Sequence, residues 1–219
     1  MMKTFLSIGS GPGIGFATAE RFAKEGFHVV LSARTAEKTK GLVDQLTAKG
    51  YSAEAKTVDA GNPASVSDLV AAVEKQHGAI EVLHYNAAFI RQATFASQPI
   101  ESFNTDLAVN IGGSLAATQA VAQAMVKNGS GTVLLTGGGF ALSPHPDYLS
   151  ISIGKAGIRA QALALFDALK EQGIHIASVT VGTFVNPDSK EATDIGEAFW
   201  KLYSQPKSAW TAEVMYPQN

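Results

Sequence analysis

A glycine-rich stretch near the start of the chain, GSGPGIG at residues 9–15, has the composition of a phosphate-binding turn. Five of its seven positions are glycine or proline, and glycines let a backbone approach a ligand closely. By composition alone it could be a tight turn. Its place between an apolar run and a helix-like segment favours a pyrophosphate cradle, because the free N–H groups of a helix N-terminus would face the ligand. The spacing Gly9-xxx-Gly13-x-Gly15 is not GxGxxG. We expect cofactor contacts from Gly9, Ser10, Gly13, Ile14 and Gly15.

Strand-like and helix-like segments alternate along the chain and would position this turn. The strand-like runs are continuously apolar, which is typical of a parallel sheet covered by helices on both faces. We expect strands at residues 3–8, 27–33, 52–60, 80–88, 131–137, 174–182 and 212–217. We expect helices at residues 14–26, 35–50, 62–78, 99–128, 147–172 and 194–205. Right-handed crossovers then predict one α/β domain over residues 1–219, a doubly wound Rossmann fold with about seven strands.

The composition argues against several other classes of protein. The chain has 219 residues, of which 46% are hydrophobic and 16% charged, so a large buried core is possible. The net charge is −2 and no block of Lys and Arg occurs, which argues against a nucleic-acid partner. There is no cysteine, and the five histidines have no metal-ligand spacing, so we expect no metal site. No apolar run is long enough for a membrane span or a signal peptide, so we expect a cytoplasmic protein.

Motifs spread over nearly the whole chain resemble those of the short-chain dehydrogenase/reductase family. The GxxxGIG turn is the first of them. YNAA at 85–88 resembles the family's NNAG, with Tyr85 and Ala88 as departures. The segment GKAGIRA at 154–160 resembles the one that carries the family lysine, and VGTFVN at 181–186 resembles the PG motif over the nicotinamide. The resemblance implies an NAD(P)-dependent oxidoreductase that acts on a small carbonyl or alcohol.

The end of the second predicted strand bears on the choice of cofactor. Where an acidic residue would bind the ribose 2′-hydroxyl of NAD, this chain has Ala33, followed by Arg34. A guanidinium pairs bidentately with phosphate, so we expect NADP, with NAD the less favoured choice. The alternative is that Arg34 is a solvated charge at a helix entry. The family pattern implies further cofactor contacts from Asp59, Asn86, Ala87, Lys155 and Gly182.

The residues that the family uses for proton transfer are only partly present. The resemblance implies a tyrosine four residues before Lys155 and a serine after the fifth strand, but Ile151 and Gly138 occupy these positions. Tyr148 could replace the tyrosine, although helical side chains lean toward the N-terminus and so away from Lys155. Its alternative role is an aromatic wall of the pocket. The candidate catalytic residues are therefore Lys155, Asn110 and Tyr148, and a water held by Lys155 and Asn110 is the other candidate donor.

Two other functions come from the same residues. Without the tyrosine and the serine, the chain could bind NADP and turn nothing over, as a sensor or an assembly partner. A methyltransferase of similar fold would want an acidic residue after the second strand, and Ala33 and Arg34 argue against it.

The last third of the chain bears on substrate and assembly. Residues 183–205 are expected to form a short substrate loop and a helix. The helices at 99–128 and 147–172 are apolar on more than one face. The family makes its main dimer contact with these two helices, so we expect a homodimer or homotetramer.

Overall fold

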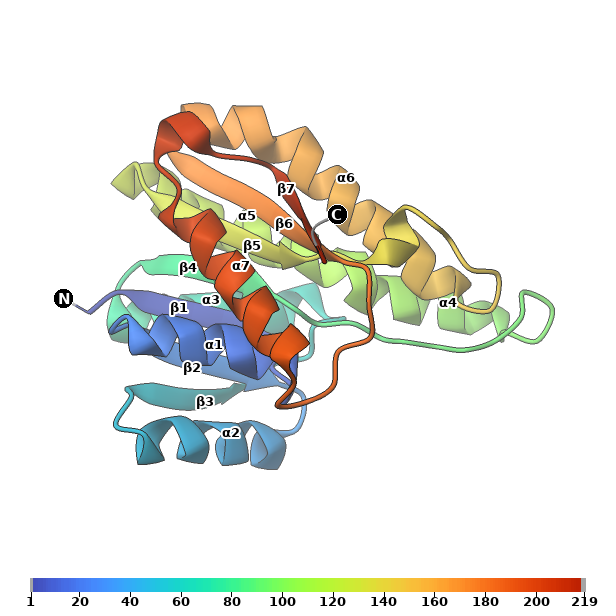
Figure 1. Ribbon diagram of the computed structural model, residues 1–219, viewed down its shortest axis with the longest axis horizontal. Coiled ribbons are helices and arrows are strands. Elements are labelled where there is room, and N and C mark those ends of the chain that lie inside the picture. Colours follow the sequence, from blue (N-terminus) through green and yellow to red (C-terminus); the bar gives the residue numbers. More distant parts are fainter. Residues whose placement is uncertain (1, 218–219) are drawn as a thin grey trace.

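Seven parallel strands form one sheet at the centre of the molecule (Figure 1). The computed structural model describes residues 2–217. The strands are β1 (Thr4–Ile8), β2 (His28–Ala33), β3 (Ala53–Thr57), β4 (Ile80–Tyr85), β5 (Gly131–Thr136), β6 (Ile174–Val181) and β7 (Glu213–Tyr216). Their order is β3-β2-β1-β4-β5-β6-β7. This order is that of a doubly wound Rossmann sheet, so the predicted fold class is confirmed.

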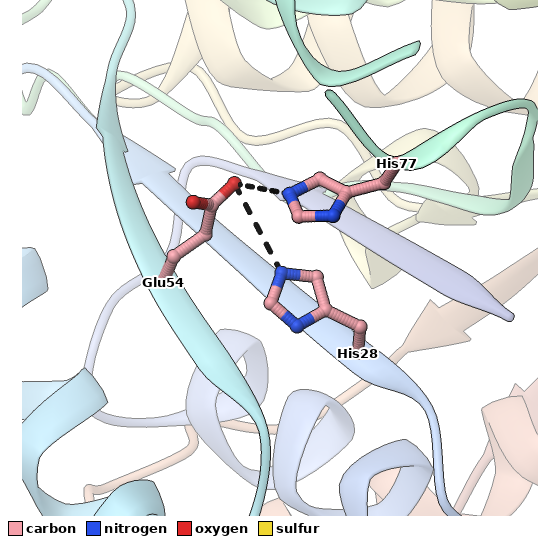
Figure 2. Close-up of side chains that lie close together, drawn as sticks. All are labelled: His28, Glu54 and His77. Atoms are coloured by element: carbon pink, nitrogen blue, oxygen red, sulfur yellow. Dashed lines mark hydrogen bonds and ion pairs between the residues drawn. The ribbon is translucent and has the colours of Figure 1, made fainter. Parts of the chain in front are cut away.

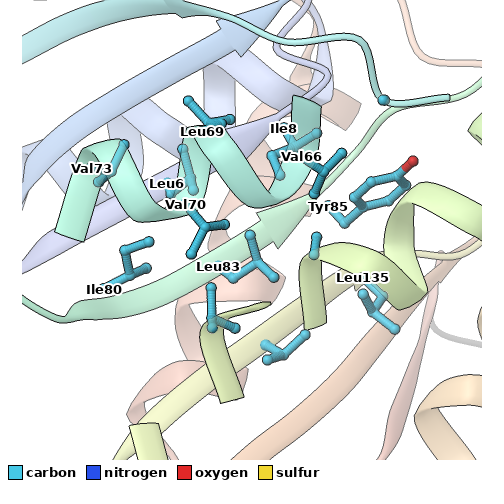
Figure 3. Close-up of a cluster of buried hydrophobic side chains, with 14 of the residues drawn as sticks. Leu6, Ile8, Val66, Leu69, Val70, Val73, Ile80, Leu83, Tyr85 and Leu135 are labelled. Atoms are coloured by element: carbon cyan, nitrogen blue, oxygen red, sulfur yellow. The ribbon is translucent and has the colours of Figure 1, made fainter. Parts of the chain in front are cut away.

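Helices cover both faces of the sheet. They are α1 (Ile14–Lys24), α2 (Ala36–Ala48), α3 (Pro63–His77), α4 (Ile100–Leu107), α5 (Gly113–Asn128), α6 (Leu149–Glu171) and α7 (Lys190–Ser204). Side chains of α3, α5 and α6 share one hydrophobic core with the strands. Figure 3 shows the part of this core in which α3 side chains lie against those of β1 and β4. Side chains of α1, α2 and α7 build the second core on the other face. None of these helices, within residues 2–217, is long and apolar enough to cross a bilayer.

An aromatic group ties α7 to α1 in the second core. Trp200 and Tyr203 on α7 meet the Phe22 ring edge-on, with ring centroids 5.2 Å and 5.5 Å away. The Arg21 guanidinium lies 4.6 Å above the Trp200 ring and pairs with Glu197. These half-buried aromatics therefore pack against the second core and hold α7 to α1.

Helix α7 begins four residues earlier than the sequence pattern predicts. The structure begins it at Lys190, after Ser189, whose hydroxyl accepts a hydrogen bond from Ala192 N at 3.1 Å. Lys190 and Asp194 form an ion pair one helical turn apart. The predicted helix began only at residue 194, so it left Lys190 outside. The serine cap and the ion pair instead extend the helix through this residue.

The single helix predicted at 99–128 is interrupted. A π-helical turn at Ala108–Gly112 separates α4 from α5. At its centre, Asn110 Oδ1 accepts from Phe89 N at 2.6 Å and Asn110 Nδ2 donates to Phe89 O at 3.0 Å. Helix α6 passes so close that a Cβ at Gly154 would lie 2.4 Å from Asn110 Cβ. The wide turn therefore directs Asn110 onto the loop after β4, and a glycine on α6 makes room for it.

Because α6 and Asn110 are this close, adding a methyl group at Gly154 should destabilise the fold. Gly154→Ala should lower the free energy of unfolding by about 1–3 kcal/mol, because the overlap with Asn110 forces the helices apart. Gly41→Ala is the matched control, since Gly41 lies within α2 and has no atom within 4 Å of its would-be Cβ. There the change should stabilise the chain by about 0.4–1 kcal/mol. Denaturant unfolding of both variants checks this, and a neutral Gly154→Ala would contradict the packing.

Candidate functional site

The glycine-rich turn lies where the sheet order changes direction, between β1 and β4. Gly9 follows β1 and Asn86 follows β4, and Asn86 Nδ2 donates to Gly9 O at 2.8 Å. Gly9 has φ +85°, and a Cβ there would lie 2.3 Å from Ala87 Cα. A side chain at this position is therefore excluded both by conformation and by space. In doubly wound sheets, ligands bind at the carboxyl ends of the strands at this switch point.

Helix α1 begins directly behind the turn. Its N-cap is Gly13, with no side chain capping the N–H groups of the first turn. The nearest neighbour of a would-be Cβ at Gly13 is Val185 O at 3.9 Å, from the segment before α7. At Gly15, by contrast, a Cβ would lie 3.1 Å from Ser10 Cα. The N-terminus of α1 is thus free of side chains and can receive an anion.

A cavity of about 300 Å³ opens beside the turn. It is lined by Gly9, Ser10, Gly11, Ala33, Arg34, Val58, Ala60, Asn86, Ala87, Ala88 and Val109. The lining thus includes five of the residues predicted to contact the cofactor. The strand predicted at 80–88 ends at Tyr85, because the next three residues leave the sheet to line this cavity. The exposed side chain of Arg34 stands at its edge.

Three of the predicted contacts make local hydrogen bonds. The Ser10 hydroxyl donates to Ser7 O and accepts from Ser32 N, both at 3.2 Å, so it faces the sheet. Asp59 Oδ1 accepts from Gly61 N at 3.0 Å and shapes the turn after β3. Gly182 N donates to Tyr216 O at 2.7 Å, which holds the end of β6 to β7.

A buried polar chain supports the cavity from behind. His84 Nε2 lies 3.0 Å from Thr136 Oγ1, which donates to Asn86 Oδ1 at 2.9 Å. Since the Thr136 proton is used toward Asn86, the His84 ring must donate from Nε2. His84 is fully buried, and burial lowers its pKa to about 3, with the Lys155 charge adding to the shift. Sequence reasoning missed His84, and the available signal was a polar residue in the apolar run of β4.

Lys155 reaches the end of β5 from α6. Its Nζ donates to Thr136 O at 2.6 Å, so Thr136 joins the lysine to Asn86 and the glycine turn. Burial lowers the Lys155 pKa to about 8. The ammonium is therefore held by the backbone at the end of β5.

Tyr148 is the N-cap of α6 and stands outside the helix. Its ring stacks on Phe140 with centroids 5.4 Å apart, and His145 meets it edge-on at 5.5 Å. Its carbonyl accepts from the Ser152 amide and the Ser152 hydroxyl. The helix predicted from 147 begins at Leu149, so arguments from helical spacing do not fix where the Tyr148 hydroxyl points.

Comparison with known proteins agrees with this architecture. A family model for short chain dehydrogenases matches residues 3–195. The chain belongs to the short-chain dehydrogenase family. A subunit of (2S)-[(R)-hydroxy(phenyl)methyl]succinyl-CoA dehydrogenase from Thauera aromatica is 30% identical over 98% of this chain and 94% of its own length. Glucose 1-dehydrogenase from Gluconobacter oxydans is 29% identical over 90% of this chain and 75% of its own length.

Solved structures of short-chain dehydrogenases share the whole fold. One from Rhodopseudomonas palustris superposes with a TM-score of 0.90 at 28% identity and covers 99% of each chain. A metagenomic short-chain oxidoreductase, solved in complex with NADP, gives a TM-score of 0.90 at 22% identity, with 97% and 96% covered. The second likeness is one of fold alone.

The structure describes the surroundings of Ile151 and Gly138, the two positions where the resemblance implies a tyrosine and a serine. Ile151 is 3% exposed and offers no proton. A Cβ at Gly138 would lie 3.1 Å from Lys155 Cγ, so a side chain there would press on the stem of the lysine. Gly138 thus gives Lys155 room to reach Thr136.

At neutral pH the Lys155 ammonium should lower the free energy of unfolding, because burial disfavours its charged form. The Lys155 pKa falls from 10.5 to about 8 on folding, so between these pH values the unfolded chain binds more protons. Stability contributed by this group therefore rises from pH 8 to pH 10.5 and is missing below pH 8. Lys155→Met should stabilise the chain at pH 7 by on the order of 1–2 kcal/mol, less than the full shift because Thr136 O loses its donor.

Chemical unfolding at pH 7 and at pH 10 measures this effect. The gain in Lys155→Met should be smaller at pH 10. Lys127→Met, which removes an exposed ammonium from α5, should change the unfolding free energy little at either pH. A Lys155→Met variant less stable than the wild type at pH 7 would contradict the buried charge.

Proposed function

We propose that this chain is an NADP-dependent oxidoreductase that acts on a small carbonyl or alcohol. The observation that carries the proposal is the turn at the β1–β4 switch point, where Gly9 can bear no side chain and the start of α1 is uncapped. Such a turn suits a pyrophosphate, and the cavity beside it extends to Arg34. Its 300 Å³ is of the size that suits the nucleoside part of a dinucleotide.

The residues at the end of β2 support NADP over NAD. Ala33 supplies no carboxylate for a ribose 2′-hydroxyl, and Arg34 is exposed at the cavity. A guanidinium there can form charge-assisted hydrogen bonds with a 2′-phosphate. The relative with NADP bound has the same fold, which is consistent with this choice.

Lys155 and Tyr148 are the proposed proton-handling residues. The bound cofactor would supply or accept the hydride, and the substrate oxygen needs a proton from the chain or from water. Tyr148 is our proposed donor, in the aromatic group that follows β5. A water held by the Lys155 ammonium is the other source. Because both ends of the Asn110 amide are bonded to Phe89, we assign Asn110 a positioning role beside Lys155.

A second candidate function is NADP binding without turnover. Ile151 and Gly138 favour it, since neither can donate a hydrogen bond from its side chain to a substrate oxygen. The chain would then serve as a cofactor sensor or as a partner in an assembly. Both functions need the same cofactor site. They differ only in whether a substrate beside that site is oxidised or reduced.

We further propose that the chain is a cytoplasmic homodimer or homotetramer that pairs through α5 and α6. Leu115 on α5 is 50% exposed, and Ile153 and Leu163 on α6 are each 45% exposed. Apolar side chains on neighbouring helices support burial against a second copy. The segment at 183–189 and α7 are the proposed substrate-binding region, since Val185 lies near the glycine turn.

The cofactor choice is tested at Arg34. Arg34→Ala should raise the Kd of NADPH by about 10- to 100-fold, because one charge-assisted contact to the phosphate is lost. NADH affinity should change less than about threefold. Lys127→Ala, which removes a cation at the opposite edge of the sheet, is the matched control. Fluorescence titration measures all three proteins, and tighter binding of NADH than NADPH by the wild type would contradict the proposal.

The proton donor is tested at Tyr148. Tyr148→Phe keeps the ring stacked on Phe140 and removes only the hydroxyl, so kcat should fall by about 10²–10⁴-fold. NADPH oxidation over a panel of aldehydes and ketones is the assay. Tyr51→Phe, before β3, is the control and should leave turnover unchanged. Unchanged turnover in Tyr148→Phe assigns the proton to water, and no turnover of any carbonyl by the wild type favours the second function.

A further inference from the structure

Two histidines and a glutamate meet near the amino-terminal ends of β2 and β3 (Figure 2). The cavity beside the glycine turn lies at the opposite, carboxyl ends of the strands. His28 is the first residue of β2, Glu54 lies in β3, and His77 is the last residue of α3. Their ligand atoms all lie within 4.8 Å of one another. No function described above uses these three side chains.

The fold brings them together through strand register and helix packing. Glu54 is paired with Val30, and His28 stands two residues before Val30 on the same face of β2. That face packs against α3, since Val30 and Val73 belong to one core. His77 follows Val73 by one helical turn and so projects from the same side of α3. All three side chains are directed to one point by elements of the rigid core.

The three ligand atoms are spaced nearly as they would be around a bound metal ion. Glu54 Oε1 lies 2.9 Å from His77 Nε2 and 4.0 Å from His28 Nε2. Ligand atoms of a tetrahedral zinc lie about 3.3 Å apart, as bonds of about 2.0–2.1 Å require. Small shifts of the rings, each below about 1 Å, would bring the three atoms to that spacing.

The outer atoms of two of the three side chains, His28 and Glu54, have partners that orient them. His28 Nδ1 lies 2.7 Å from Ser52 Oγ, and Glu54 Oε2 accepts from Gln76 Nε2 at 3.1 Å. His28 Nε2 is buried and has no hydrogen-bond partner in the structure. Outer partners of this kind orient ligand side chains around a metal. Burial, together with the neighbouring His77, lowers the His28 pKa.

We propose that His28, Glu54 and His77 bind one divalent transition-metal ion, with zinc the best fit. Two imidazole nitrogens and one carboxylate oxygen prefer zinc over magnesium or calcium, which favour oxygen ligands. Three protein ligands leave a fourth position for water. The C-terminal end of α3 carries a partial negative charge, which further favours a cation beside His77.

Lys56 competes with the metal for Glu54. Its Nζ lies 3.5 Å from Glu54 Oε1 and donates to Gln76 Oε1 at 2.9 Å. The Lys56 side chain is 29% exposed, so it can turn to solvent or keep Gln76 when a metal takes the carboxylate. The metal would then join β2, β3 and α3 at the edge of the sheet that lies away from the cofactor.

Zinc titration of the full, tag-free chain tests the site after chelator treatment and dialysis. Calorimetry should give one zinc per chain, and zinc at 100-fold above its Kd should raise the Tm by about 5–10 °C. Magnesium at the same concentration should give no shift. An equal response to magnesium, or no saturable zinc binding by the wild type, would overturn the proposal.

Variants of single ligands identify the site. His28→Asn keeps the Glu54–His77 ion pair, so its metal-free Tm should stay near that of the wild type while zinc affinity falls at least tenfold. His77→Asn should lose zinc binding to a similar or larger extent. His145→Asn removes an exposed histidine from the loop before α6 and should bind zinc as the wild type does. Zinc affinity retained in His28→Asn and His77→Asn would place the metal elsewhere and overturn the assignment.

Discussion

The functional site depends on the close approach of two strand ends. β1 and β4 are neighbours, and the Asn86 amide at the end of β4 bonds to Gly9 O at the end of β1. Gly9 has no room for a side chain against Ala87, and Thr136 in turn fixes Asn86. Because this chain of contacts is largely buried, displacing one member leaves another polar group without a partner. The glycine turn, the cavity and the lysine thus form one rigid unit at the ends of three strands.

The position of Lys155 in this unit is independent of the residue one helical turn before it. Lys155 is bonded to Thr136 O of the sheet, so its position does not depend on a tyrosine one turn earlier in α6. Ile151 is buried and apolar, and the missing side chain at Gly138 leaves space for the lysine stem. The contacts among the glycine turn, Asn86, Thr136 and Lys155 therefore do not involve the aromatic residues that follow β5.

Much of the fold could be predicted because its causes are local. Apolar runs, glycines at helix ends and the Gly-rich turn placed nearly every strand and helix within a few residues of its observed bounds. The exceptions have tertiary causes. The π-helical turn at Ala108–Gly112 follows from the contact of Asn110 with Phe89 and from the close approach of α6 at Gly154. Trp200 and Tyr203 on α7 pack against Phe22 on α1. This contact joins two segments far apart in the sequence.

The sequence by itself determined the parallel α/β sheet, the place of the glycine turn and the spacing of Ile151 and Lys155 on one helix. These depend on residue type and spacing within one segment. Only the tertiary structure decided that Tyr148 stands outside α6 and that the Ser10 hydroxyl faces the sheet. It also joined His28, Glu54 and His77, which the spacing of the histidines did not predict. Their meeting depends on strand register and on the packing of α3, and neither is encoded in any single stretch of the chain.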